Sequence, residues 1–229
     1  IGCERCETMT IANTKLKAFL PHVMPSVDGC PRPVAELQLR NAAIEFCERT
    51  RAWRHMMAVT LTAQNQSVSS PNYTAIHEIE DATFDGIALT PTQFTDVGPT
   101  ELTGQESLGF PRYVTQIAPS MLSVYPFATG TLRMSVFLKP RSGQAFGTDP
   151  DDPLHDAFNM VPEFMLSQHA DTIAAGALSR IMALPKQRFT NEAMAGFYMT
   201  KFMEHCDRKS DTSMRGQQRA PKRTTSRYM

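Results

Sequence analysis

The chain has 229 residues, 41% of them hydrophobic, which is enough apolar material for the core of one large domain or two small ones. Its 23 Lys and Arg residues balance 23 Asp and Glu residues, so the net charge by itself predicts neither nucleic acid nor an anionic membrane as the partner. The sequence contains no run of about 18 apolar residues and no secretory signal pattern, so we expect a folded soluble protein that works in the cytoplasm or in something assembled there.

The first element in chain order is an N-terminal arm, residues 1–27. Within it, residues 14–23 (TKLKAFLPHV) carry apolar side chains at helical spacing, but Pro21 interrupts the pattern. The segment therefore predicts either a short helix or an irregular docking arm.

The five cysteines are spaced in a way that favours reduced thiols. Cys3 and Cys6 form a CxxC pair, which could supply half of a zinc site or a thiol redox pair. A complete zinc site needs four ligands, and Cys30, Cys47 and Cys206 are scattered along the chain without a second short-spaced pair. We therefore predict no metal and no disulfide framework.

The strongest helical pattern lies in AELQLRNAAIEFCERTRAWR, residues 35–54. On one side of this segment, Glu36 with Arg40 and Glu45 with Arg49 stand four residues apart, acid first, which is the favourable order for surface ion pairs. The apolar stripe on the other side recurs at steps of three or four residues: Ala35, Leu39, Ala42, Phe46, Thr50 and Trp53.

From Met57 to residue 140 the pattern changes to the alternation that is typical of strands. Asp85-Gly86 is a signal for a tight turn between two of these strands. Residues 90–110 are rich in Thr, Gly and Pro with little periodicity and predict a long loop. Six segments alternate or read as strands: 58–64, 73–79, 83–89, 112–118, 121–127 and 131–138.

Two more helices are predicted after a linker of Gly, Asp and Pro at residues 141–153. The first begins near Val161, ends before Pro185 and contains a small-residue run at 174–177 that would let a neighbouring helix approach closely. Thr190 or Asn191 can cap the last helix. The apolar side of the first helix comprises Leu166, Ala170, Ile173, Ala177 and Ile181, and that of the last comprises Met194, Phe197 or Tyr198, and Phe202.

Residues 207–229 carry seven basic and two acidic residues, so this tail has a charge of +5 and the remainder of the chain −5. One aromatic residue, Tyr228, offers no interleaved platform for stacking bases. Taken alone, the tail fits either a solvated end or an arm that orders on a partner.

No sequence motif points to catalysis, because the chain has no phosphate-binding glycine loop, no HExxH and no nucleophile elbow. The acidic clusters at 77–81 and 149–156 do not match the spacing of a calcium loop. We therefore predict a non-enzyme with no catalytic residue, no cofactor and no metal ion.

The combined pattern predicts an α+β fold. In this prediction the N- and C-terminal helices, residues 28–56 and 154–206, form an α-helical bundle, because a single amphipathic helix cannot bury its stripe alone. An antiparallel β domain, residues 57–140, is inserted into the bundle and followed by the linker at 141–153. A basic C-terminal arm, residues 207–229, extends from it.

Two segments of 27 residues each resemble head-to-tail adaptor proteins of tailed bacteriophages and prophages. The first, DGCPRPVAELQLRNAAIEFCERTRAWR at 28–54, is similar to the N-terminal motif of that family. The second, GALSRIMALPKQRFTNEAMAGFYMTKF at 176–202, resembles the family's C-terminal pattern of a small-residue helix, a proline break and another helix. These proteins are relatives in architecture of the upper tail-tube ring (tail tubular A, gatekeeper-type) of short-tailed phages. Phe189 stands where we would expect a tryptophan in this family.

The resemblance implies a structural virion protein of the head-to-tail neck, assembled in the host cytoplasm. It implies a homo-oligomeric ring of twelve copies around the DNA channel, with the portal protein and tail or nozzle proteins as partners. Any contact with packaged DNA would be non-specific, and no membrane is involved. The β domain would face the tail, with the loop at 90–110 as the candidate for tail-side contacts, and the C-terminal segments would reach into the portal.

The candidate site residues follow from that picture. The core anchors are Leu39, Phe46, Trp53, Ile173 and Ile181. The candidates for an interface with the portal, ring neighbours or the DNA backbone are Arg40, Arg49, Arg51, Arg54, Arg215, Arg219, Lys222, Arg223, Arg227 and Tyr228.

Two alternatives stay open from the sequence. One is a different ring of the neck or tail, such as a head-completion or tail-terminator protein. The other is a phage-encoded nucleic-acid-binding regulator that uses the basic tail and a zinc ion held by Cys3 and Cys6. Phosphate binding by the regulator would weaken steeply with salt concentration.

Overall fold

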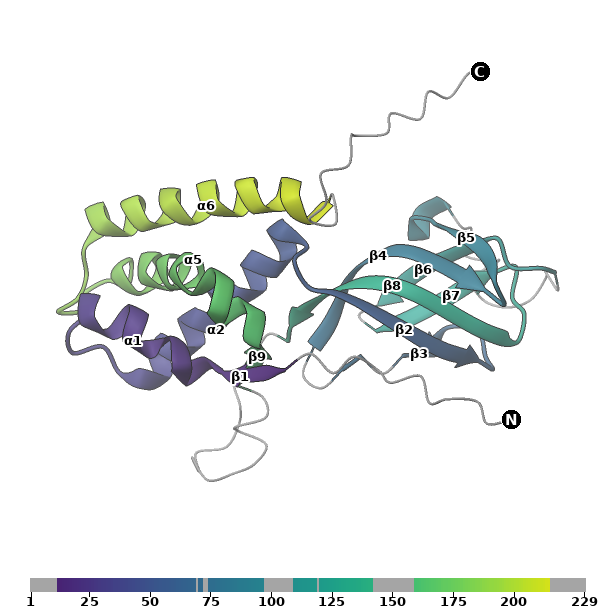
Figure 1. Cartoon of the computed structure of the whole chain (residues 1–229), viewed down its shortest axis with the longest axis horizontal. Coiled ribbons are helices and arrows are strands. Elements are labelled where there is room, and N and C mark those ends of the chain that lie inside the picture. Colours follow the sequence, from purple (N-terminus) through teal and green to yellow (C-terminus); the bar gives the residue numbers. More distant parts are fainter. Residues whose placement is uncertain are drawn as a thin grey trace, which may run out of the picture. The chain divides into compact units, whose positions relative to one another are not determined.

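The computed structural model of the chain divides into two compact units, which are described separately (Figure 1). The helical unit comprises residues 12–43 and 159–205, and the sheet unit comprises residues 44–141 and 206–214. The structure describes six stretches of the chain: 12–68, 70–71, 74–96, 109–118, 120–141 and 159–214.

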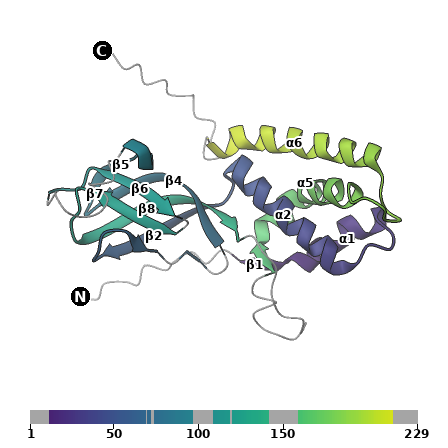
Figure 2. The same cartoon turned by 180° about the vertical axis from the view of Figure 1, so that it is seen from behind.

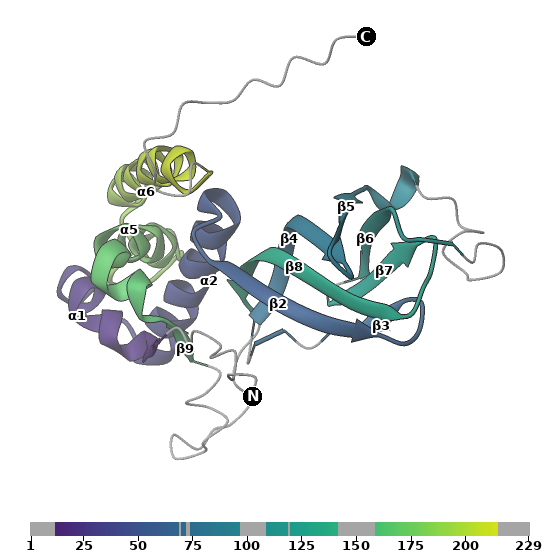
Figure 3. The same ribbon diagram turned by 45° about the vertical axis from the view of Figure 1, so that its right-hand side comes forward.

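In the helical unit, α5 lies against α1, α2 and α6 (Figure 3). The last residues of α2 and α6 belong to the sheet unit. The elements in chain order are β1 (Asn13–Lys15), η1 (Leu16–Phe19), α1 (Leu20–Val23), η2 (Met24–Ser26), α2 (Arg32–Thr50), β9 (Met160–Pro162), α5 (Glu163–Met182) and α6 (Glu192–Met214).

The N-terminal segment is a series of short helical turns, as the interrupted pattern indicated. Pro21 lies in the first turn of α1, where its missing N–H costs no hydrogen bond. Leu16, Phe19 and Val23 are fully buried. No sequence pattern predicted the antiparallel pair of β1 with β9, because three residues are too few to show alternation.

Gly176 in α5 sits where two other helices come close. A Cβ atom at this position would lie 2.8 Å from the ring of Phe202 in α6 and 3.1 Å from the Cβ of Ala42 in α2. The prediction that the small-residue run lets a neighbouring helix approach closely is therefore confirmed.

The sheet unit contains one seven-stranded sheet whose order is β2-β8-β4-β5-β6-β7-β3 (Figures 2 and 3). β5 and β6 run parallel, and every other neighbouring pair runs antiparallel. The strands are β2 (Arg54–Leu61), β3 (Gln66–Ser67), β4 (Thr74–Phe84), β5 (Ile87–Pro91), β6 (Tyr113–Ala118), β7 (Met121–Tyr125) and β8 (Gly130–Pro140), with a short η3 helix (Phe94–Asp96) after β5.

The predicted fold class is wrong in its main feature. The chain is mixed α and β, but the seven-stranded sheet dominates it, and the described residues contain four α-helices in place of a bundle that carries an inserted β unit. The sheet is also not purely antiparallel. Alternation identifies individual strands, but it contains no information on their order or on how much of the fold they organise.

The end of α2 differs from the prediction as well. The stripe placed Trp53 on the helix, but α2 ends at Thr50, and Arg51 adopts a left-handed backbone conformation with φ of 50°. The N–H of Arg51 still bonds to the carbonyl of Cys47, at 2.9 Å, so the helix closes with a common C-terminal turn. Trp53 therefore lies in the extended link to β2, and its helical spacing is a coincidence.

The Asp85-Gly86 turn is confirmed. It joins β4 to β5 with φ of 46° and 87°, and the flanking Phe84 and Ile87 are paired, as in a two-residue type I′ hairpin. We expect Gly86→Ala to lower the free energy of unfolding by about 1 kcal/mol, because a Cβ atom is disfavoured at this φ. Urea denaturation measures the change, and an unchanged midpoint would contradict the strain argument.

Candidate interaction site

The four arginines that the sequence singled out in α2 and directly after it, Arg40, Arg49, Arg51 and Arg54, lie in different environments. Arg40 is only 3% exposed, within the helical unit. It donates a hydrogen bond to the side chain of Asn159, and burial lowers its pKa to about 10 although the nearby charge of Glu36 opposes the shift. Arg40 is therefore part of the interior of its unit, which corrects its placement on an exposed arginine face.

Arg49 forms the surface pair that the spacing predicted. Its Nε lies 2.8 Å from a carboxylate oxygen of Glu45, four residues earlier in α2. Both side chains are partly exposed, so this pair contributes only about 0.3 to 0.5 kcal/mol.

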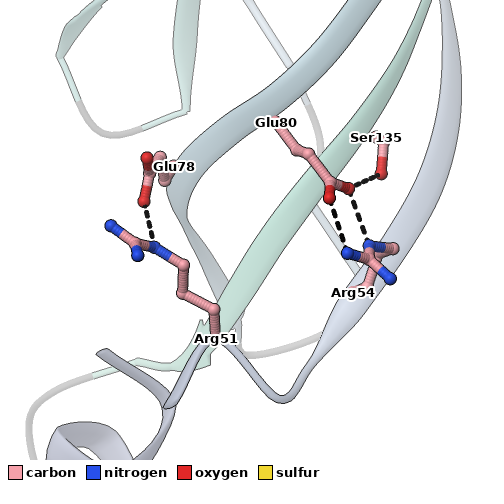
Figure 4. A network of polar contacts seen from close by, with 5 residues as sticks. All are labelled: Arg51, Arg54, Glu78, Glu80 and Ser135. Carbon is pink, nitrogen blue, oxygen red and sulfur yellow. Dashed lines mark hydrogen bonds and ion pairs between the residues drawn. The ribbon is translucent and has the colours of Figure 1, made fainter. Parts of the chain in front are cut away.

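Arg51 and Arg54 bind two carboxylates of β4 (Figure 4). Arg51 Nε lies 2.6 Å from Glu78, and Arg54 makes a two-pronged contact with Glu80 through Nε at 2.6 Å and Nη2 at 2.5 Å. The hydroxyl of Ser135 donates a third hydrogen bond to Glu80, at 2.7 Å. We call these five side chains the arginine–glutamate network.

The two glutamates lie on an irregular part of β4. The register between β4 and β8 shifts between Ile76 and Glu78 and again between Ile79 and Asp81. A bulge inserts an extra residue into one strand and redirects its side chain. Glu80 lies at the second shift, and the sequence pattern of a regular strand contained no signal for this displacement.

The network changes the acidity of Glu80. Partial burial raises its pKa, but hydrogen bonds from Arg54 and Ser135 and the charge of Arg54 outweigh burial, so the pKa falls below its ordinary value. A lowered folded-state pKa stabilises the protein fully above the unfolded value, and this contribution is lost as the pH falls through the folded value.

We expect Glu80→Gln to lower the free energy of unfolding by about 1 kcal/mol at neutral pH, because solvent still screens side chains that are about one-third exposed. The difference between the variant and the unmodified chain should shrink in acid, since the wild-type carboxylate is then protonated. Denaturant unfolding at several pH values measures it, with Glu45→Gln as the surface-pair control. An effect of Glu80→Gln that is the same at every pH would contradict the account.

Two further contacts bind cations of the sheet unit to other residues of the chain. Lys139 lies 2.6 Å from Glu48, and the Arg54 guanidinium also stands 5.3 Å from the centre of the Phe137 ring. Arg49, Arg51 and Arg54 are therefore each paired with a carboxylate of the same chain.

The five residues expected as core anchors are all buried: Leu39, Phe46, Trp53, Ile173 and Ile181. Trp53 is 7% exposed, and its carbonyl accepts a hydrogen bond from the N–H of Leu138 in β8, at 2.8 Å. Its indole Nε1 has no hydrogen-bond partner. Trp53 thus attaches the link after α2 to the sheet.

The exposed apolar side chains were missed from the sequence. Phe197 of α6 is 58% exposed and Met194 is also exposed, whereas the buried side of the helix runs through Ala195, Phe202 and Cys206. The sequence analysis placed Met194 on the core side of α6. The buried stripe begins one residue later, at Ala195, and periodicity alone does not distinguish two stripes that differ by one residue. In the sheet unit the exposed large apolar residues are Met56, Ile87, Phe110 and Tyr113.

The tail candidates lie outside the described residues: Arg215, Arg219, Lys222, Arg223, Arg227 and Tyr228. α6 continues to Met214, so the first part of the segment that begins at residue 207 is helical. In the long loop, residues 97–108 also fall outside the description, as do Cys3 and Cys6.

The described residues contain no group of three or more His, Cys, Asp or Glu side chains that could hold a metal ion. Cys30, Cys47 and Cys206 are buried free thiols. Burial raises the pKa of Cys47, the nearby Glu48 and Cys206 raise it further, and Lys139 lowers it in part, so this thiol stays protonated at neutral pH.

Each unit also contains an open pocket. One, of about 330 Å³, lies in the helical unit beside Asp28 and Arg188. The other, of about 390 Å³, lies in the sheet unit between β4 and β6. In the part of the chain that the structure covers, none of the helices has the length and hydropathy required to span a membrane.

Comparison with known proteins identifies the family. A search of curated protein sequences found no match. The model of the SU10 adaptor protein family, by contrast, matches residues 31–225, from the start of α2 through both units and into the tail. The match covers most of the 229 residues, and the chain therefore belongs to the SU10 adaptor protein family, a family of structural phage adaptor proteins.

Proposed function

We propose that the chain joins the portal ring to the tail as a subunit of a dodecameric head-to-tail adaptor ring around the DNA channel. The family match carries this proposal, because it spans residues 31–225 and names an adaptor. A family of structural adaptors also favours a non-catalytic role.

The chemistry of the sheet unit favours protein partners over nucleic acid. Arg49, Arg51, Arg54 and Lys139 each have a carboxylate of the same chain as a neighbour, so they are not available as a row of cations for DNA phosphates. The exposed apolar side chains of α6 and of the sheet are, in contrast, suited to burial against protein. The nucleic-acid-binding regulator therefore has less support than the adaptor.

A closed ring needs two different and complementary surfaces on each subunit. In this proposal Arg49, Arg51 and Arg54 lie near such a surface but act mainly within the chain, whereas the tail residues from Arg215 to Tyr228 reach the portal or a neighbouring copy. Many weak tail contacts, one set from each subunit, would add up to firm attachment.

Co-sedimentation with the portal protein of the same genome tests the proposal. We expect the chain to sediment with portal rings at about one copy per portal subunit at physiological salt. Sedimentation with a tail ring but not with the portal would favour a head-completion or tail-terminator role instead. Salt-sensitive binding to duplex DNA without binding to either ring would favour the regulator.

A further inference from the structure

Among the described strands, the first part of β4 has an unpaired edge in the sheet. β4 pairs with β8 along its whole length, but on its other side only Ala82, Thr83 and Phe84 pair with β5. β5 ends at Pro91, which has no N–H to continue the ladder, and Thr92 then bonds to Val114 of β6 at 2.9 Å. Residues 74–81 of β4 therefore have a strand neighbour on one side only, among the residues that the structure describes.

The pocket of about 390 Å³ lies along this unpaired edge of β4. Glu78 and Ile79 of β4 form one wall, and residues 91–93 together with Val114, Thr115 and Gln116 form the other. The Gln116 amide reaches across to the carbonyl of Ile76 at 3.5 Å, the long limit of a hydrogen bond. We call this pocket the β4 groove.

The β4 groove has the chemistry of a site for an added strand. Backbone N–H and C=O groups of β4 that do not bond to β8 point to this side and offer hydrogen bonds to an extended peptide, with the regular alternation interrupted at the two register shifts. The lining is uncharged apart from Glu78, and Glu80 and Asp81 follow on the same strand. Glu78 and Glu80 are paired with Arg51 and Arg54, and Asp81 adds a third carboxylate to the same strand, so this strand disfavours an acidic partner.

The C-terminal tail meets these requirements in sequence. Residues 215–229 contain five basic residues and no acid. The last eight, KRTTSRYM, have no Gly or Pro, and Thr224, Thr225 and Ser226 are small side chains between Arg223 and Arg227. Fifteen residues beyond the end of α6 span about 50 Å when extended, which is enough to reach another subunit.

We propose that residues 222–229 of a neighbouring copy add as a strand to β4 in the β4 groove. This inference rests on the proposed ring, because the groove and the tail then supply the two unlike surfaces that a head-to-tail contact needs. The backbone hydrogen bonds would give the contact its strength, and the basic side chains would favour the acidic strand.

A peptide of residues 215–229 tests the inference on the full chain carrying Thr225→Pro, whose own tail has lost the central strand N–H. We expect this peptide to bind and to slow hydrogen exchange at the amides of residues 74–81. The same peptide with Thr225→Pro keeps its charge and should bind at least tenfold more weakly. Equal binding of the two peptides, or unchanged exchange in β4, would overturn strand addition.

The unmodified chain separates a neighbouring copy from self-insertion. We expect protection of the β4 amides to increase with protein concentration, whereas protection that is independent of concentration would overturn the contact between copies. Failure of the inference and failure of the adaptor role are distinguishable, because portal co-sedimentation is measured separately. Peptide results against strand addition together with intact portal binding would leave the adaptor role standing.

Discussion

Replacing Gly176 with leucine is expected to lower the free energy of unfolding by about 2 to 3 kcal/mol. Leucine is the better helix former by about 0.8 kcal/mol, so propensity alone predicts the opposite sign. The first added atom, however, would lie 2.8 Å from the ring of Phe202, which is fully buried and cannot move aside without displacing α6. The steric cost therefore exceeds the propensity gain.

Gly196 provides the matched control because it also lies inside a helix, in α6, but has no atom within 4 Å of the position of an added Cβ. Gly196→Leu should raise the free energy of unfolding by up to about 0.8 kcal/mol. Guanidinium denaturation of both variants measures the two values. If both substitutions changed stability in the same direction and by the same amount, the close packing of α5 on α6 would be contradicted.

Removing residues 215–229 is expected to abolish assembly on the portal and to leave the body folded. The cut lies beyond α6, so buried side chains such as Phe202 and Cys206 remain in place. Multivalent attachment of a closed ring can exceed the affinity of a single contact by about 10² to 10⁴, and losing the tail from every subunit removes that gain together with the proposed contact between copies. Co-sedimentation with portal rings measures assembly, and a thermal melt checks the fold.

A tail of equal length with its five basic residues changed to glutamine separates charge from chain length. If charge contributes, this variant should bind the portal more weakly than the unmodified chain, and the remaining difference should shrink as salt rises. Normal assembly by the deletion variant would rule out the tail as the attachment segment.

Local patterns in the sequence predicted the individual elements of the fold well. Alternation located the strands of the sheet except β3, Asp85-Gly86 located a turn, and the small-residue run around Gly176 located a close helix contact. These features depend on neighbouring residues, which a linear pattern records.

Features that depend on distant residues could not be predicted in the same way. The parallel pairing of β5 with β6, the bulge at Glu80 and the contact of Glu80 with Arg54 come from strand order and register. The burial of Arg40 depends on Asn159, 119 residues away. An i,i+4 spacing could suggest a surface pair for Arg40 but contained no signal for that partner.

The candidate interaction site was predicted only in part. The sequence drew attention to Arg51 and Arg54, but their partners Glu78 and Glu80 lie on β4 and were not associated with them. The exposure of apolar residues such as Phe197 was not predicted. Amphipathic periodicity identifies an apolar stripe, but it does not show which residues at the edge of the stripe are buried.

Electron-microscopy class averages of the portal from the same genome, purified with and without this chain, test the central claim most directly. The adaptor account predicts an added ring of density on the tail-facing side of the portal, with one subunit for each of twelve positions. A portal that looks the same in both preparations, with the chain left unbound, would contradict it.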